Sequence, residues 1–195
     1  MKVVSSKQMA SIETLAFKEG ASELDFMEEA GSGIALVVHD YVEMHNSGRN
    51  VILLCGQGNN GGDAYVAGIN LLALEYQVTA YQLFPINTCS HLCQQHHNHF
   101  LLDGGKIVEV QSIRDIALPE DGIIVDGIFG TGFHGTVDEP IAAIIDLINQ
   151  SNLPIIAVDI PSGLNGNTGE VNGKAVIATE TAFLGLPKIG FMMLS

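Results

Sequence analysis

The stretch that most constrains the fold is residues 51–68, VILLCGQGNNGGDAYVAG, where an apolar run leads into a glycine-rich turn. The branched apolar start is typical of a buried strand, and a helical pattern begins at about Asp63. Gly56, Gly58 and Gly61 have the G-x-G-x-x-G spacing that lets a chain turn sharply from strand to helix beside a ligand. Because the first N–H groups of such a helix are free, the turn favours a bound anion such as phosphate.

Two features of this region argue against an ordinary nicotinamide dehydrogenase. The next expected strand, residues 78–84, ends in YQLF and carries no acid to hold a ribose. Polar groups lie inside the turn instead, as Asn59, Asn60 and Asp63. Asp63 would repel a bound phosphate, and a bound cation or a hydrogen-bonded hydroxyl would remove that conflict. The alternative is that the two asparagines only shape the turn and Asp63 only caps the helix.

Apolar strand patterns alternate with helical patterns along the chain, with short loops between them. This alternation predicts an α/β fold in which a parallel sheet is covered by helices on both faces. A length of 195 residues suits a single domain with a sizeable core. We expect helices over residues 5–19, 22–45, 63–75 and 139–150, and strands over residues 51–54, 78–84, 107–110 (at a sheet edge), 123–125 and 155–158.

The second expected helix contains two glycines, Gly31 and Gly33. Glycine costs a helix about 1 kcal/mol relative to alanine. We interpret both glycines as places of close packing rather than of chemistry.

Charge and cysteine content narrow the classes of partner. The formal net charge is −14 and the eight Lys and Arg residues are scattered, so we expect no nucleic acid partner. No stretch approaches the ~20 apolar residues that span a membrane, and the first residues lack the apolar core of a signal peptide. Three cysteines imply no disulfide framework. We therefore expect a cytoplasmic protein with no membrane partner.

Residues 88–99, TCSHLCQQHHNH, contain two cysteines and four histidines. Their spacing is not that of the two separated ligand pairs that zinc modules use. On a helix, His96 and His99 share one face, and Cys89 and Cys93 share another. We expect an ordinary surface helix with one small buried cysteine rather than a metal site.

Polar groups follow three of the expected buried strands, next to glycine. Because the carboxyl ends of the strands in a doubly wound sheet line the ligand crevice, these groups should converge. Any one of them could be only a helix cap or a turn former, but three in register favour a common site. Their oxygen atoms suit an alkali or alkaline-earth cation, not zinc. The groups are Asn59, Asn60 and Asp63, then Asp126, then Asp159 and Ser162.

Three motifs resemble signatures of the NAD(P)H-hydrate epimerases, the YjeF N-terminal family: GQGNNGGDAYVAG, VDGIFGTGFHG and AVDIPSGLNGNTGEV. Residues 26–31 and 179–190 resemble two further family stretches, so the resemblance covers nearly the whole chain. It implies a Rossmann-like three-layer α/β/α sandwich with a mostly parallel central sheet. It also implies interconversion of the R and S forms of NADHX and NADPHX, which are hydrated nicotinamide cofactors. A partner dehydratase that acts on the S form can then repair the whole pool.

The resemblance also implies which residues form the site. Members bind one potassium ion, and the implied ligands here are Asn60, Asp126 and Ser162. Relatives dimerise, which implies a homodimer. The implied substrate contacts come from Asn59, Asn60, Gly61, Gly62 and Asp63, from Gly130, Thr131, Gly132, Phe133, His134, Gly135 and Thr136, and from Asp159.

Family members usually continue through a further strand beyond the position of Ser195, and some continue into a C-terminal dehydratase domain. We therefore expect residues 1–195 to form one epimerase-type domain whose C-terminal end is truncated. Such a chain fits a fragment of a two-domain repair enzyme.

Inversion at C6 of the hydrate needs one group that gives a proton and another that takes one. Asp159 is the first candidate, because it ends a buried strand where desolvation would raise its pKa. Lys188 is the second, the alternative being a solvated lysine that follows a strand. His134 could assist from its loop, although a lone loop histidine is more often structural or solvated.

Two other functions stay open at this point. A non-catalytic YjeF-type nucleotide-binding or dimerisation module, such as the related domain of the enhancer of mRNA decapping family, predicts loss of the polar strand-end groups and some basic surface. A dehydrogenase that uses ordinary NAD(P) predicts an acid for the ribose. The strand-end groups are present, the net charge is strongly negative and that acid is absent, so the epimerase is favoured.

Overall fold

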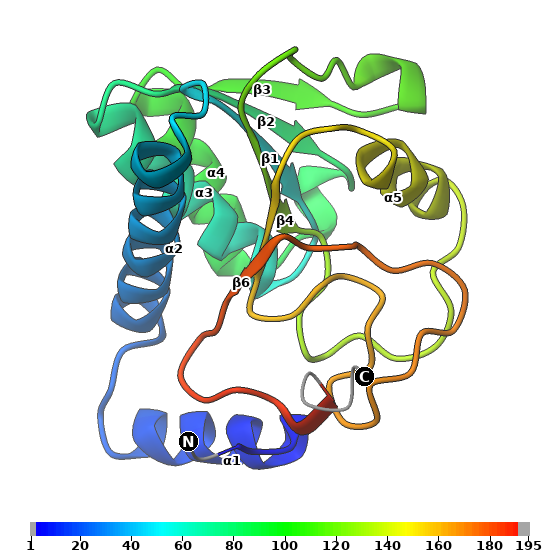
Figure 1. Ribbon diagram of the computed structural model, residues 1–195. Coiled ribbons are helices and arrows are strands. Elements are labelled where there is room, and N and C mark those ends of the chain that lie inside the picture. Colours follow the sequence, from blue (N-terminus) through cyan, green and yellow to red (C-terminus); the bar gives the residue numbers. More distant parts are fainter. Residues whose placement is uncertain (1–2, 191–195) are drawn as a thin grey trace.

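The computed structural model describes residues 3–190 and contains one six-stranded sheet (Figure 1). The strand order is β3-β2-β1-β4-β5-β6, and every neighbouring pair is parallel. The α/β fold predicted from the sequence is therefore confirmed, including the edge position of the third strand. The strands are β1 Asn50–Cys55, β2 Gln77–Gln82, β3 Lys106–Glu109, β4 Ile123–Gly127, β5 Ile155–Val158 and β6 Glu180–Ala182.

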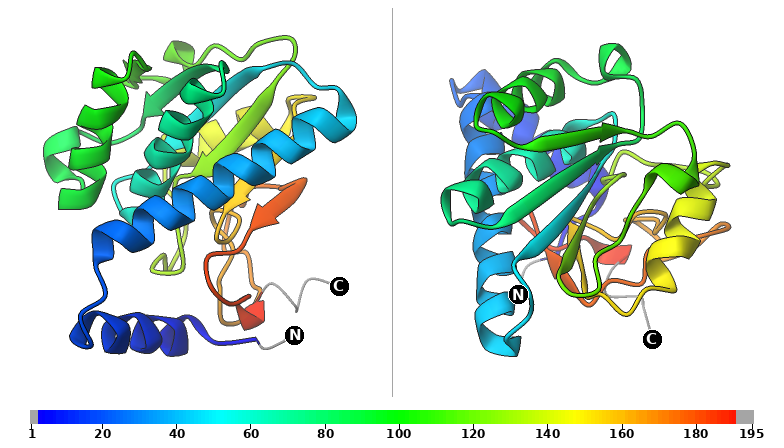
Figure 2. Two further views of the ribbon diagram at one scale, coloured as in Figure 1. Left: turned by 90° about the vertical axis from the view of Figure 1, so that its left-hand side faces the viewer. Right: turned by 90° about the horizontal axis from the view of Figure 1, so that it is seen from above.

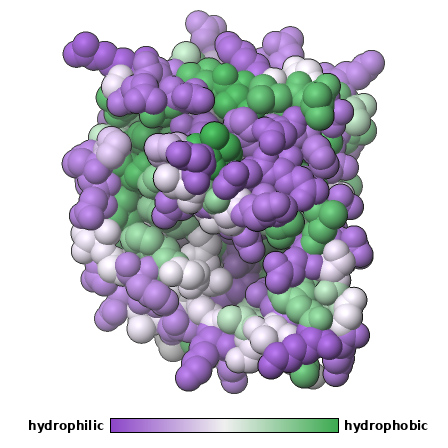
Figure 3. All heavy atoms as spheres, turned by 180° about the vertical axis from the view of Figure 1, so that it is seen from behind, coloured by the Kyte–Doolittle hydropathy of each residue, from purple (hydrophilic) through white to green (hydrophobic). Residues whose placement is uncertain are grey.

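Helices cover both faces of this sheet and make the fold a three-layer sandwich. Figure 1 shows α2, α3 and α4 on one face and α5 on the other. The α-helices are α1 Ser6–Lys18, α2 Glu23–His45, α3 Asn59–Ala73, α4 His91–Leu102 and α5 Ile141–Asn149, and short 3₁₀ helices span Ile86–Thr88 and Ile113–Asp115. None of the helices within residues 3–190 has the length and apolarity needed to cross a bilayer. Figure 3 shows the rear face as mostly polar, with apolar areas among the polar ones.

Two apolar clusters hold the layers together, and β1 supplies both of them. Val51, Leu53 and Cys55 pack in the cluster that also contains core residues of α2, α3 and α4. Ile52 and Leu54 pack in the cluster that contains the apolar side of α5. Because successive side chains of a strand point to opposite faces, an apolar run without alternation is what a strand buried on both faces requires.

The first helix, α1, lies apart from these layers, across the carboxyl end of the sheet (Figures 1 and 2). The strand order reverses at β1, because β1 pairs with β2 on one side and with β4 on the other. Such a switch point opens a crevice between the loops that follow the two strands. The register places Cys55 beside Gly127, so the glycine-rich turn and the loop after β4 start next to each other.

Several element boundaries differ from the sequence prediction by one to four residues, and two of these differences are the start of α3 and the end of β2. The helix after the glycine-rich turn begins at Asn59 rather than at Asp63, so Asn59 and Asn60 lie in its first turn. Gly58 remains extended as the N-cap residue, and its carbonyl accepts a hydrogen bond of 3.1 Å from the N–H of Gly61. The second strand ends at Gln82 rather than at residue 84.

The fourth helix is not the ordinary surface helix with one buried cysteine that the sequence suggested. Cys93, His96, His97 and Phe100 are all buried on it, and Cys89 just before it is buried too. The polar sequence of α4 did not indicate this burial. Helix α3 packs against both α2 and α4, and His96 and His97 of α4 are buried there.

The two glycines of α2 have different surroundings, although the sequence suggested close packing for both. A Cβ added to Gly31 would lie 2.3 Å from the Cβ of Val66 on α3, whereas nothing lies within 4 Å of one added to Gly33. Close packing of α2 on α3 therefore explains Gly31 only. The packing interpretation of Gly33 is wrong.

These glycines give a matched test of the helix packing. Gly31→Ala should lower the free energy of unfolding by roughly 1–3 kcal/mol, because α2 and α3 must move apart. Gly33→Ala should raise it by up to about 1 kcal/mol, because alanine is the better helix former. Urea denaturation of both variants measures this difference, and equal effects at the two positions would contradict the packing.

Candidate active site

A large cavity of about 1340 Å³ opens at the carboxyl ends of the strands, between the strand-end loops and helices α1 and α2. We call it the strand-end cavity. Its walls include much of the predicted substrate-binding set, together with apolar and acidic residues of α1 and α2 that the sequence did not suggest. The predicted residues that line it are Asn59, Asn60, Asp63, Gly130, Thr131, Gly132, Phe133, His134 and Asp159.

Four predicted contact residues do not line this cavity. Gly61 and Gly62 face the protein interior, where an added Cβ would meet the backbone of Gly56 at 2.2 Å and the sulfur of Met27 at 2.6 Å. These two glycines therefore let α3 pack closely at its start. Gly135 and Thr136 are exposed beyond the part of the loop that borders the cavity.

Asn60 ties the start of α3 to both neighbouring strand ends. Its amide nitrogen donates to the carbonyl of Phe129 at 3.1 Å and to the carbonyl of Val158 at 3.0 Å. The amide oxygen accepts no hydrogen bond from the described residues and lies against Gly130, where an added Cβ would be 2.7 Å away. Asn60 thus has one uncommitted oxygen at the edge of the cavity.

Asp126 and Ser162 form a buried cluster below Asn60. Asp126 is fully buried and accepts hydrogen bonds from the Ser162 hydroxyl at 2.6 Å, the Ser162 N–H at 2.8 Å and the Ile128 N–H at 3.3 Å. Burial raises the pKa of Asp126 to about 6, although these hydrogen bonds lower it. The Ser162 hydroxyl also contacts the carbonyl of Phe129, at 3.2 Å, which Asn60 shares.

The predicted cation ligands are therefore linked to one another, because Asn60 and Ser162 share the Phe129 carbonyl and Ser162 donates to Asp126. The oxygens of Asn60, Asp126, Ser162 and Phe129 make an all-oxygen set, which fits an alkali cation by donor chemistry. One negative charge in the set suits a single monovalent ion.

Asp159 and Lys188 form a buried ion pair at the end of β5. The Lys188 ammonium donates to Asp159 Oδ1 and, at 2.9 Å, to the carbonyl of Leu184. Lys188 is 1% exposed and Asp159 is 7% exposed, so the alternative of a solvated lysine is wrong. Lys188 also does not extend a strand of the sheet but forms an isolated parallel bridge with Val4.

The backbone of Asp159 is strained, which sets it apart from ordinary strand-end residues. Its φ of +65° lies in the left-handed region that few residues other than glycine and asparagine adopt. Its N–H donates to the carbonyl of Ala182 at 2.8 Å, and its Oδ1 accepts from the Leu184 N–H at 3.1 Å. The surrounding contacts thus hold this carboxylate in one orientation, toward the cavity.

Asp63 is the most perturbed acid of the cavity. It is 6% exposed. Burial, the charge of Asp159 and the charge of Glu13 raise the pKa of Asp63 to about 8. At neutral pH this carboxyl is therefore mostly protonated and able to donate a proton. The sequence had suggested a charged carboxylate at this position.

Helix α1 contributes a site residue that sequence reasoning missed. Glu13 lines the cavity, and burial raises the pKa of its carboxyl against the lowering effect of Lys188. No local sequence signal marked it, because α1 is held at the cavity by contacts distant in sequence, such as the Val4–Lys188 bridge just before it and the hydrogen bond from the Ser6 N–H to the Asn167 side chain.

Comparison with known proteins gives consistent matches. A sequence model of the family described as "YjeF-related protein N-terminus" matches residues 23–190. The NAD(P)H-hydrate epimerase of Lentilactobacillus buchneri is 35% identical over 90% of this chain and 79% of its own length. The NAD(P)H-hydrate epimerase of Elusimicrobium minutum is 32% identical over 97% of this chain and 88% of its own.

Longer relatives and a solved structure also match. The bifunctional NAD(P)H-hydrate repair enzyme Nnr of Moorella thermoacetica is 32% identical over 99% of this chain but only 38% of its own length. The chain thus spans little more than a third of that relative. The crystal structure of the yeast protein ynu0 superposes with a TM-score of 0.85 at 23% identity, over 100% of this chain and 85% of that one, and shows the fold alone.

The raised pKa of Asp63 predicts how the free energy of unfolding depends on pH. Because the folded-state pKa of about 8 exceeds the ordinary 3.8, the folded protein binds more protons between these values, and stability falls as pH rises through that window. Asp63→Asn should therefore have a higher free energy of unfolding than the wild type at pH 8. Between pH 5 and pH 8 its free energy of unfolding should fall by roughly 2–4 kcal/mol less than that of the wild type. Urea denaturation across this range, with the exposed Asp40→Asn as control, measures the difference. Parallel profiles for wild type and Asp63→Asn would contradict it.

Proposed function

Because the chain belongs to the family of YjeF-related protein N-termini, we propose that it is an NAD(P)H-hydrate epimerase that interconverts the R and S forms of NADHX and NADPHX. The names of two relatives that it covers over most of their length support this activity. The observation that carries the proposal is the pairing, in one cavity, of the protonated Asp63 with the Asp159 carboxylate. These two groups meet the need for an acid and a base.

The chemistry of the hydrate assigns a task to each group. In one route a base removes the proton of the C6 hydroxyl, the C6–N1 bond breaks to leave an aldehyde, and an acid protonates N1. Ring closure on the other face then reverses these steps. In the other route an acid protonates the hydroxyl, water leaves, and water adds to the opposite face and gives its proton to the base. We assign the acid to Asp63 and the base to Asp159, with Lys188 as the residue that positions Asp159.

A potassium ion completes this proposal, with Asn60, Asp126 and Ser162 as its ligands. The contact of both Asn60 and Ser162 with the Phe129 carbonyl, and the uncommitted amide oxygen of Asn60, support this choice. The ion would neutralise Asp126 and fix the start of α3 to the loop after β4. We assign it an ordering role and no chemical step.

The rest of the cavity is assigned to the remainder of the substrate. Its volume of about 1340 Å³ suits a dinucleotide, and the loop from Gly130 to Thr136 is assigned to contacts with it. The name "bifunctional" of the longer relatives supports a dehydratase as the functional partner, on the same full-length chain. We place the protein in the cytoplasm, in keeping with three free cysteines, and propose a homodimer by analogy with its family.

The direct test is an assay of epimer exchange. The protein, supplied with potassium, should equilibrate purified R and S hydrates faster than the spontaneous reaction and produce no NAD(P)H. Proton NMR or chromatography of the two epimers measures the rate. A rate equal to that in buffer would refute the proposed activity for this chain.

Asp159→Asn tests the base while preserving the backbone. Asparagine tolerates the left-handed conformation of this position, and its side-chain oxygen can still accept hydrogen bonds from the Lys188 ammonium and the Leu184 N–H, so the variant should fold. The epimerisation rate should fall by roughly 10²-fold or more while hydrate binding is retained. The exposed Asp138→Asn is the control and should keep the wild-type rate. A normal rate in Asp159→Asn would reduce Asp159 to a substrate anchor.

The potassium assignment is tested by crystallography. Crystals grown in potassium should contain density between Asn60, Asp126 and Ser162, at oxygen distances longer than the ~2.3–2.6 Å of calcium. Asp126→Ala should abolish this density and weaken hydrate binding, because the cavity loses its order. Unchanged hydrate binding by this variant, or an empty position at good resolution, would contradict the assignment.

A further inference from the structure

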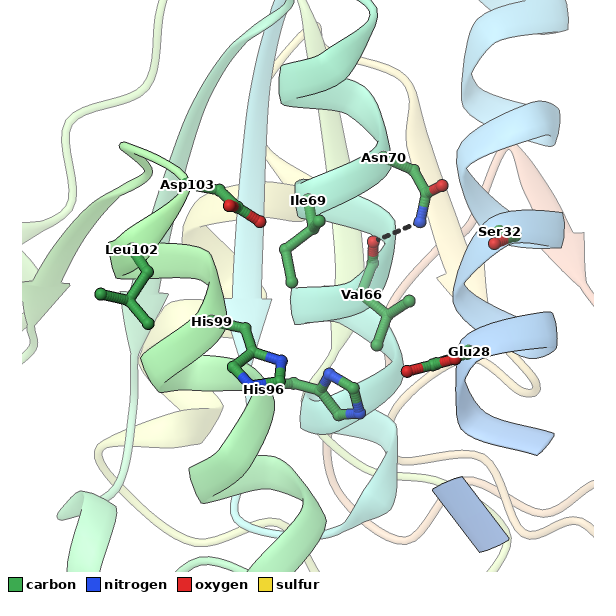
Figure 4. A pocket seen from close by; sticks show the side chains of 9 residues that line it. All are labelled: Glu28, Ser32, Val66, Ile69, Asn70, His96, His99, Leu102 and Asp103. Atoms are coloured by element: carbon green, nitrogen blue, oxygen red, sulfur yellow. Dashed lines mark hydrogen bonds between the residues drawn. The ribbon is translucent and has the colours of Figure 1, made fainter. Parts of the chain in front are cut away.

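A second hollow lies outside the strand-end cavity, across the outer side of α3. We call it the helix groove; its volume is about 410 Å³ (Figure 4). Helix α3 forms its floor, α2 forms one wall, and α4 with the residue after it forms the other. The lining residues are Glu28, Ser32, Val66, Ile69, Asn70, His96, His99, Leu102 and Asp103.

One buried nitrogen of the helix groove has no partner. His96 is 2% exposed, and its Nε2 atom makes no hydrogen bond with the described residues. A buried polar atom without a partner costs free energy and is rare in native proteins. Burial and the neighbouring His99 lower the pKa of His96, so its ring is neutral and can offer a lone pair at neutral pH. A ligand in the groove would supply the missing contact.

The charged residues of the groove indicate that the ligand is positively charged. Figure 4 shows Glu28 on one side and Asp103 on the other, with Val66 and Ile69 between them. None of the nine lining residues is Lys or Arg, so an anion would be repelled. The amide nitrogen of Asn70 already donates to the Val66 carbonyl at 2.9 Å, which leaves its oxygen as a further acceptor.

A metal ion is a poorer fit than an organic cation. Among residues 3–190, no three His, Cys, Asp or Glu side chains are placed to hold a metal. The volume of about 410 Å³ is also larger than a single ion needs, and Val66 and Ile69 lie between the two acids. An occupant with a charge at each end and a hydrocarbon chain between them matches the arrangement of acids and apolar floor.

We propose that the helix groove binds an aliphatic diamine or a longer linear polyamine. One ammonium group lies between Glu28 and His96 Nε2 and donates to both. The methylene chain covers Val66 and Ile69, and the second ammonium group pairs with Asp103. The lysine side chain of another protein shares half of this chemistry, but it brings a single charge and would leave one acid unpaired.

The test compares small probes on the intact chain at physiological ionic strength, because a net charge of −14 attracts any cation weakly. The probes are 1,4-diaminobutane and spermidine, with 1-aminobutane and 1,4-butanediol as controls that carry one charge and none. Calorimetry should give a single saturable site for the diamine and for spermidine. 1-Aminobutane should bind at least tenfold more weakly than 1,4-diaminobutane, and binding of 1,4-butanediol should be undetectable. Amide resonances of Val66, Ile69 and Asn70 should shift on diamine binding.

Variants locate the binding site. Glu28→Gln and Asp103→Asn, both exposed and outside the strand-end cavity, should each weaken diamine binding at least tenfold and leave epimer exchange unchanged. Asp40→Asn, an exposed acid of α2 outside the groove, is the matched control and should bind the diamine normally. Failure of the diamine experiment and failure of the epimerase assay are thus separate results.

Three outcomes would overturn the proposal. Equal weakening in Asp40→Asn would show attraction to net charge only. Equal binding of 1-aminobutane and the diamine would remove the role of the second acid and point to a single-charge ligand such as a lysine side chain. A saturable site for Zn²⁺ that shifts His96 and His99, with no effect of the diamine, would make the groove a metal site.

Discussion

The arrangement of the strand-end cavity depends on the buried ion pair between Lys188 and Asp159. A buried pair of this kind repays its desolvation only if its geometry is fixed and its remaining donors are satisfied. The Leu184 carbonyl and N–H meet that need, and Val4 holds the Lys188 segment through hydrogen bonds to Pro187 and Ile189. The same contacts bring α1 across the end of the sheet, which closes the cavity and places Glu13 in its wall.

The acids of the cavity also influence the pKa of one another. The charge of Asp159 is held by Lys188 and helps to raise the pKa of Asp63, as Glu13 also does. The protonated Asp63 and the ion-paired Asp159 line the same cavity, which is how one site can give and take a proton near pH 7. Helix α3 connects this cavity to the helix groove, because Asn59 and Asp63 face the former while Val66 and Asn70 line the latter.

The sequence predicted five of the six strands, the helices and the meeting of three strand ends, because apolar runs and glycine–acid pairs are local signals with a fixed place in this fold. It missed the short edge strand β6. Hydrogen bonds bring Asn60, Asp126 and Ser162 together from three strand ends, as expected from the sequence. Their roles as cation ligands stay predictions. The burial of Lys188 could not be predicted, because its partner Val4 is at the other end of the chain. The early start of α3 was missed because asparagine and glycine are weak helix formers, and only the extended Gly58 fixes that start.

The central claim is that the hydrated nicotinamide ring binds between Asp63 and Asp159, and a crystal structure of the Asp159→Asn protein with NADPHX tests it most directly. The slowed reaction should preserve the bound hydrate. We predict that the C6 hydroxyl or the ring nitrogen lies within about 3 Å of residue 63 or 159, with the phosphates against the start of α3 and the loop after β4. A hydrate ring bound elsewhere, with both residues out of reach of C6, would contradict the account.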